Sequence, residues 1–139
     1  HSFPTRRSSD LSGKYTGESK IMIGNILIAL IGILHVYILI LEMFLWDKPQ
    51  GLKAFGNTLE KAKLTKVLAQ NQGLYNGFLA AGLFWSLLVG NPDFSHAIAT
   101  FFLGCVLVAG IYGGLTASKK IIYIQAVPAL LTLCVLYLI

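Results

Sequence analysis

The chain has 139 residues, of which 55% are hydrophobic and 12% are charged, with a formal net charge of +5 and a mean hydropathy of +0.70. This composition excludes an ordinary water-soluble domain and predicts a single-domain membrane protein. The positive charge is modest and lies outside the apolar segments, so the sequence gives no support to nucleic-acid binding.

The first 21 residues differ in character from the rest of the chain. Residues 1–11 read HSFPTRRSSDL, a stretch that a common sequencing adapter encodes without a mismatch. Residues 12–21 can be encoded with a bacterial ribosome-binding site ahead of Met22. We therefore interpret residues 1–21 as a non-native, disordered leader, and we expect the natural protein to start at Met22.

Four apolar segments follow, at about 23–46, 70–90, 97–118 and 121–139. Each is close to the roughly 20 residues that a helix needs to cross about 30 Å of hydrocarbon. Helices are the spanning structure open to so short a chain, because they satisfy their own backbone hydrogen bonds in lipid. The sequence therefore predicts an all-α fold, a four-span transmembrane helix bundle formed by residues 22–139.

The connections between these segments predict an orientation. In the first connection, Asn57 with Glu60 three residues later predicts a helix N-cap, with a short interfacial helix from Thr58 onward. This connection also carries five lysines: Lys48, Lys53, Lys61, Lys63 and Lys66. The second, residues 91–96, has no lysine or arginine, and the third is Lys119-Lys120. Because basic residues favour the cytoplasmic side, we expect both termini to face outward.

Polar side chains gather in the cytoplasmic half of the predicted bundle. Glu42 and His35 lie seven residues apart in the first span and therefore share one helix face. The other polar residues at this depth are Asn71, Gln72, Tyr75, Asn76, Tyr112 and Gln125. The outer half offers little beyond the hydroxyls of Ser86 and Thr132. The pattern predicts a polar pocket that faces the cytoplasm, with His35 at its floor and an apolar plug above it.

Other residues within the spans favour structural roles. Small residues recur every four positions in Gly73-Gly77-Ala81 and in Gly110-Gly114-Ser118, a pattern that lets helices pack closely. Pro128 predicts a kink in the last span. Cys105 and Cys134 are interpreted as small apolar side chains rather than a disulfide, and no spacing predicts a metal site.

Four stretches together resemble a family of small bacterial membrane proteins catalogued as domain of unknown function 1304. They are HVYILILEMFLW (35–46), NQGLYNGFLAAGLFW (71–85), FFLGCVLVAGIYGG (101–114) and QAVPALL (125–131). The resemblance runs from Met22 to the end of the chain and implies a bacterial inner-membrane protein. It brings no catalytic role for any residue, but it favours Met22 as the natural start.

Three functional hypotheses follow from this pattern. The first is a membrane module that binds a small ligand against Glu42 and His35, without a cofactor. The second is a small proton-coupled transporter that uses Glu42 as its proton carrier. The third is a membrane enzyme with Glu42 or His35 as acid or base, which is disfavoured because the sequence supplies no nucleophile or metal for it. The expected partners are the lipid bilayer, a small ligand and a second copy of the chain. The polar residues could also act only as hydrogen bonds between helices.

Overall fold

The computed structural model describes residues 2, 4 and 8–139, and every regular element in this part of the chain is helical. In chain order the elements are α1 (Ser8–Phe44), α2 (Pro49–Phe55), α3 (Leu59–Leu88), α4 (Pro92–Thr116), the π-helix η1 (Ile122–Ala126) and α5 (Val127–Leu138). The all-α class expected from the sequence is confirmed.

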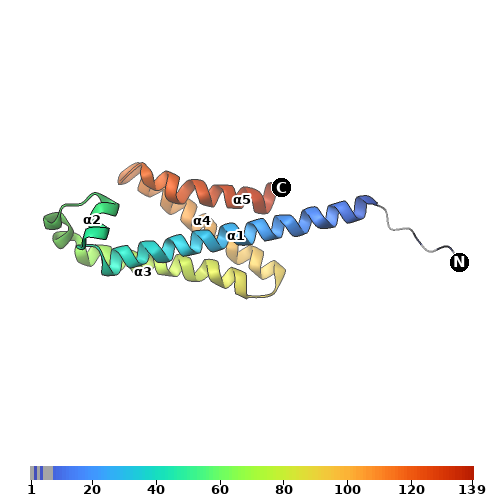
Figure 1. The fold of residues 1–139 in the computed structure, drawn as a ribbon, viewed down its shortest axis with the longest axis horizontal. Coiled ribbons are helices and arrows are strands. Elements are labelled where there is room, and N and C mark those ends of the chain that lie inside the picture. The colour runs from blue at the N-terminus through green and yellow to red at the C-terminus, as the bar shows by residue number, and fades with distance from the viewer. Residues whose placement is uncertain (1, 3, 5–7) are drawn as a thin grey trace.

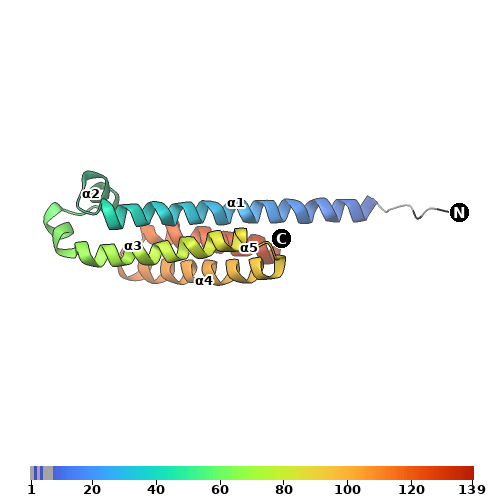
Figure 2. The ribbon, with the colours of Figure 1, turned by 90° about the horizontal axis from the view of Figure 1, so that it is seen from below.

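The four long rods of the molecule lie side by side and alternate in direction along the chain (Figures 1 and 2). Helix α1 packs on α3, α3 packs on α4, α4 packs on η1 and α5, and α5 closes the ring against α1. The buried core lies between them and is made of Ile28, Ile31, Leu83, Ala99, Leu103, Val106 and Ala129. Helix α2 stands at one end of the ring, beside the start of α3 (Figure 1).

Two of the described helices are long and apolar enough to cross a membrane, α1 over Leu11–Phe44 and α4 over Pro92–Thr116. Helix α3 is longer than needed, but its hydropathy is lowered by the polar residues around Asn71 and Asn76. The last apolar helix, Ile122–Leu138, is shorter than the other two. Buried helices of soluble proteins can be equally long and apolar, so length and composition alone do not establish the four predicted membrane spans.

Residues 8–21 are helical, where the sequence analysis expected disorder. They extend α1 past the ends of the other rods (Figure 2), and their described side chains are largely exposed. The helix propagates outward from the packed part of α1 and is supported locally by Thr16 Oγ1, which donates to Ser12 O at 2.9 Å, and by a Lys14–Glu18 ion pair at 4.0 Å. Residues 1, 3 and 5–7 of the expected leader lie outside the described residues.

The first connection is more ordered than the sequence suggested. Its helix α2 was not predicted; Pro49 occupies its first turn, and Gly56, with φ of 65°, ends it in a left-handed conformation that favours glycine. The N-cap of α3 is Thr58 rather than Asn57, because Thr58 is the residue whose side chain accepts a hydrogen bond from Lys61 N. From there α3 runs unbroken to Leu88, so the expected interfacial helix and second span are one element.

The last rod changes its winding just before Pro128. Val127 N–H donates to Ile122 O, five residues back, which makes residues 122–126 a π-helix. Pro128 has no N–H to donate, and its ring would collide with the carbonyl four residues earlier in an α-helix, so the wider turn relieves that collision. The kink that the sequence predicted here therefore takes the form of a π-turn.

Glycines of α4 make room for this wider turn. A Cβ added to Gly110 would lie 2.5 Å from Ala126 N, and one added to Gly114 would overlap the side chain of Ile122. The small residues of α3 serve a different neighbour, since a Cβ on Gly73 would lie 2.6 Å from Met43 Cγ of α1. The two small-residue runs thus pack α3 on α1 and α4 on η1.

We predict that Gly110→Ala lowers the free energy of unfolding by about 1–3 kcal/mol, because the added methyl forces α4 away from the π-turn. The measurement is the melting temperature of the purified protein in detergent. Gly104→Ala on the same helix is the matched control, since nothing lies within 4 Å of its added Cβ. It should leave the melting temperature unchanged or raise it slightly. Equal effects of the two substitutions would contradict the close packing at Gly110.

Candidate polar site in the bundle

A carboxylate and an amide meet between α1 and α3. Asn76 Nδ2 donates to Glu42 Oε1 at 2.5 Å, and the two residues are only 4% and 6% exposed. Gly73 permits this contact, because a Cβ there would lie 3.1 Å from Glu42 Cβ, so the backbone of α3 sits directly against Glu42. Asn76 follows one helical turn later and faces the same way. The sequence thus places a donor where the buried carboxyl needs one.

A second polar pair joins α1 to the π-turn. His35 is fully buried. Its Nδ1 lies 2.8 Å from Ile31 O, and its Nε2 lies 3.2 Å from Gln125 Nε2. A carbonyl oxygen can only accept, so Nδ1 carries the hydrogen. Nε2 of the neutral ring then accepts from the Gln125 amide. Both nitrogens are satisfied by a neutral imidazole in a single tautomer.

Both pairs are anchored on α1. His35 and Glu42 are seven residues apart, about 10 Å along the axis at 1.5 Å per residue. One pair holds α3 and the other holds η1, so α1 is the rod through which the polar contacts of its two neighbours are linked.

The eight residues predicted for the site divide into two groups. His35, Glu42 and Asn76 are buried and Gln125 is half-buried, and these four form the two pairs. The other four predicted residues are exposed: Asn71, Gln72, Tyr75 and Tyr112. Tyr112 is exposed on the outer surface of α4, so it takes part in neither pair. Tyr112 is two residues from Gly110 and from Gly114, which face η1, so it points to the opposite side of α4.

The same geometry explains the exposed residues of α3. Gly73, Asn76 and Gly77 face α1, and Tyr75, two residues from both glycines, points away from it. Asn71 uses its amide on its own helix, where Nδ2 donates to Val67 O at 2.9 Å. Of the polar residues in NQGLYNG, Asn76 therefore lies in the core, and Asn71, Gln72 and Tyr75 lie on the outer surface of α3.

The second oxygen of Glu42 has no hydrogen-bond partner, yet it is not sealed in the core. Within the described part of the chain, Asp47 Oδ1 is the single buried side-chain oxygen or nitrogen without a partner. Glu42 Oε2 and Asn76 Oδ1 accept no hydrogen bond either, so these two acceptor atoms keep some contact with the molecular surface. The polar pair is a narrow site with free acceptors and limited access.

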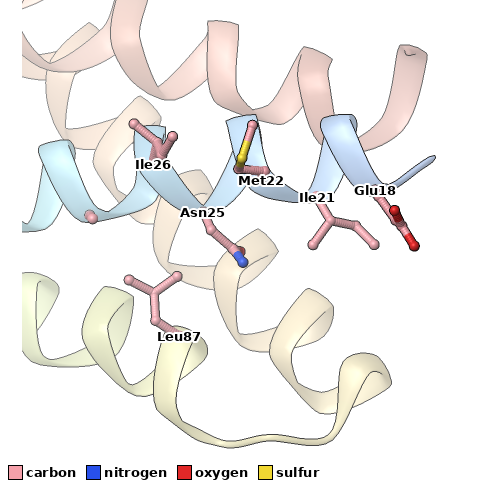
Figure 3. Close-up of a pocket in the computed structure, with 7 residues that line it drawn as sticks. Glu18, Ile21, Met22, Asn25, Ile26 and Leu87 are labelled. Carbon is pink, nitrogen blue, oxygen red and sulfur yellow. The ribbon is translucent and has the colours of Figure 1, made fainter. Parts of the chain in front are cut away.

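Two hollows of the described chain lie away from these pairs. One, of about 590 Å³, forms where α1 runs past the end of α3, and Asn25 and Leu87 are among the side chains that line it (Figure 3). The other, of about 680 Å³, is a groove on the outer face of α4 beside Phe101, Cys105 and Tyr112. Neither hollow is lined by Glu42 or His35.

A set of contacts at the end of α1 could not be predicted from the sequence. Trp46 Nε1 donates to Thr65 Oγ1 at 3.1 Å, and the indole packs on Phe55 with ring centroids 4.9 Å apart. Lys66 Nζ contacts Asp47 Oδ2 at 3.0 Å, and this ammonium holds the pKa of Asp47 below its usual range. Partners 19 residues apart leave no local pattern, so only the fold could bring them together.

A smaller set at the opposite end was missed for the same reason. Tyr137 of α5 lies 2.7 Å from Thr100 Oγ1 of α4, and Thr100 donates to His96 O. Because the Thr100 hydroxyl hydrogen is committed to that carbonyl, the tyrosine hydroxyl donates to Thr100. The ring of His96 packs edge-on against Tyr137. These contacts tie α4 to α5 and bind no predicted site residue.

Fold and site together define an all-helical protein in which one long apolar helix holds its neighbours through two buried polar pairs. The chain belongs to the family described as "Protein of unknown function (DUF1304)", whose model matches residues 29–137 and therefore includes both pairs. The family resemblance seen in the sequence is confirmed. The chain is also 31% identical over 110 residues to "Uncharacterized protein YpaA" of Lactococcus lactis subsp. lactis (strain IL1403), an alignment that covers 78% of this chain and 91% of that protein. No solved structure matches the chain.

We predict a coupling free energy of about 1–3 kcal/mol between Glu42 and Asn76, because removing either residue leaves the other buried without its partner. A double-mutant cycle with Glu42→Ala and Asn76→Ala, followed by unfolding of the protein in detergent micelles, measures it. The same cycle between Glu42→Ala and Asn71→Ala should be additive within about 0.5 kcal/mol, since Asn71 bonds only its own helix. Additivity in both cycles would contradict the buried pair.

Proposed function

We propose that the protein is a bacterial inner-membrane protein of four spans, which binds a proton or a small cationic hydrogen-bond donor at Glu42. The observation that carries the proposal is the state of the Glu42 carboxyl: it is buried in an apolar bundle beside one neutral donor, and its second oxygen accepts no hydrogen bond. No cation is paired with it in the described chain. A buried carboxylate is stabilised when it binds a proton or pairs with a cation, because its negative charge is then neutralised.

The membrane location is supported by the apolar surface of the molecule. Large apolar side chains are exposed along α1 and α4, including Leu30 at 57% and Val108 at 67%. Such continuous apolar exposure on long helices suits contact with lipid rather than water. With α3 and the η1–α5 rod packed against these two helices, all four would share the bilayer.

The proposed orientation is supported by the distribution of charge. All seven lysines that follow Met22 lie at the end of the molecule where α2, the start of α3 and the α4–η1 turn meet, as the placement of these elements in Figure 1 indicates. The opposite turn, around Gly90, carries no basic residue between α3 and α4. The lysine-bearing end would therefore face the cytoplasm, and both termini would face outward.

The tight packing of the polar pairs limits the size of the ligand. Glu42 and Asn76 are buried, and no hollow described above opens onto them. The free oxygens of Glu42 and Asn76 can accept hydrogen bonds, so the ligand is expected to be a donor. Because the space around them is small, we propose a proton, ammonium or a small primary amine. A larger ligand in the pocket first expected from the sequence would require the bundle to open.

We predict that the Glu42 carboxyl takes up a proton in the intact protein and that small amines compete for it. Infrared difference spectra between acid and alkaline pH should show a protonated carboxyl band that is lost in Glu42→Gln. Ammonium or methylammonium chloride should raise the melting temperature of the unmodified protein relative to sodium chloride, and Glu42→Gln should abolish that rise. Glu60→Gln, an exposed acid at the start of α3, is the matched control and should keep both responses.

The same variants separate the alternatives. If neither the band nor the amine response exists, Glu42 serves only to hold α1 to α3. If adding amine to reconstituted liposomes releases protons across the membrane, and Glu42→Gln stops the release, the protein is a proton-coupled transporter rather than a binding module.

We predict opposite accessibility for two exposed positions in a background of Cys105→Ala and Cys134→Ala. The variant Asp93→Cys, in the first turn of α4, should react with a membrane-impermeant maleimide in intact cells, because that end of α4 is expected to face outward. A cysteine at Lys53, on α2, should react only after the membrane is opened. The reverse pattern would overturn the orientation, and labelling of both sites only in the soluble fraction would overturn the membrane location.

A further inference from the structure

The elements that bear the lysines lie at one end of the molecule, which we call the basic platform (Figure 1). It consists of α2, the first three turns of α3 and the turn between α4 and η1. Its lysines are Lys48, Lys53, Lys61, Lys63, Lys66, Lys119 and Lys120, and all but the half-buried Lys66 are exposed. The acids at this end are Asp47 and Glu60. Because Asp47 is occupied by Lys66, six lysines remain against Glu60 alone.

Apolar side chains are interleaved with these lysines. Leu64 is 82% exposed and Leu68 is 71% exposed on α3, and Phe55 is exposed at the end of α2. Lysines and exposed leucines on neighbouring positions of one helix give a surface that can place charge at a headgroup level and apolar groups just below it. A surface for a soluble acidic partner would not need the apolar groups.

Side-chain contacts fix the platform to the helix bundle. Trp46 packs on Phe55 and bonds Thr65, and Lys66 bonds Asp47, so α2 and the start of α3 are both fastened to the end of α1. The lysines are therefore presented on fixed helices. A fixed surface binds without the cost of ordering a loose loop.

We infer that the basic platform binds the phosphate headgroups of anionic phospholipids in the leaflet next to it. The charge is complementary, the interleaved apolar groups match the boundary between headgroups and chains, and the position beside the α1 and α3 ends puts the lysines at the depth of lipid phosphates. The inference rests on the proposed membrane location, and it adds a lipid partner to it.

The two tryptophans of the chain allow a direct test. Trp46 follows the end of α1 and packs against Phe55 of the platform, and Trp85 lies near the far end of α3, where lysines are absent from the adjoining turn. The protein is reconstituted in phosphatidylcholine bilayers that contain a small fraction of brominated phosphatidylglycerol or brominated phosphatidylcholine, and tryptophan quenching is measured. Trp85→Phe reports on the platform, and Trp46→Phe is the matched control.

We expect brominated phosphatidylglycerol to quench Trp46 at least threefold more effectively than brominated phosphatidylcholine, and the two lipids to quench Trp85 equally. The triple variant Lys53→Gln/Lys61→Gln/Lys63→Gln, made in the Trp85→Phe background, should bring the ratio at Trp46 close to one, and so should 0.5 M salt. Inorganic phosphate at matched ionic strength should leave the ratio unchanged.

Several results would overturn the inference. A ratio of one at Trp46 in low salt, or a ratio that the triple variant does not lower, would show that the platform does not select anionic lipid. Loss of the preference on adding inorganic phosphate would make the platform a site for free phosphate instead. If neither brominated lipid quenches either tryptophan, the membrane location itself fails, which is a different outcome from equal quenching by both.

Discussion

The carboxyl group of Glu42 sets the constraint on which the rest of the bundle depends. A carboxyl removed from water must have a hydrogen-bond partner, and here that partner is a single amide on the next rod. To bring the amide within reach, α3 has to approach α1 closely, which requires a residue without a side chain at Gly73. The pairing of α1 with α3, the most extensive contact between helices in the described part of the chain, therefore rests on one polar group and one glycine as well as on apolar packing.

The contact of α1 with the π-turn likewise depends on a polar pair and on glycines. Pro128 prevents a regular α-helix from continuing through this region, and the wider turn that results carries Gln125. Gly110 and Gly114 let that turn lie against α4, and Gln125 then meets the buried imidazole of His35. A feature that would weaken an isolated helix thus adds a hydrogen bond to the direct packing of α5 on α1.

Much of this arrangement could be predicted from the sequence, and the failures have physical causes. The apolar segments located the four rods, and the cost of burying Glu42 and His35 correctly marked them as residues that need partners. Periodicity could not say which side of α3 or α4 would face inward, because Asn71 and Tyr112 look as polar as Asn76 and Gln125 in the sequence. Burial depends on where Gly73 and Gly110 find their neighbours. The Asp47–Lys66 contact depends on residues 19 positions apart, which no local pattern records. Helix α2 has local signals in Pro49 and Gly56, but with seven residues it is too short to show a helical periodicity.

The uninterrupted length of α3 has a mechanical consequence. Thirty residues at 1.5 Å each make a rod of about 45 Å, and it contains both the partner of Glu42 and the lysines beside α2. No proline lies between Lys61 and Asn76, and the helix continues without interruption through Gly73. A tilt or rotation of α3 at Asn76 would therefore displace its basic end, and a displacement of the basic end would in turn move Asn76 relative to the Glu42 carboxyl.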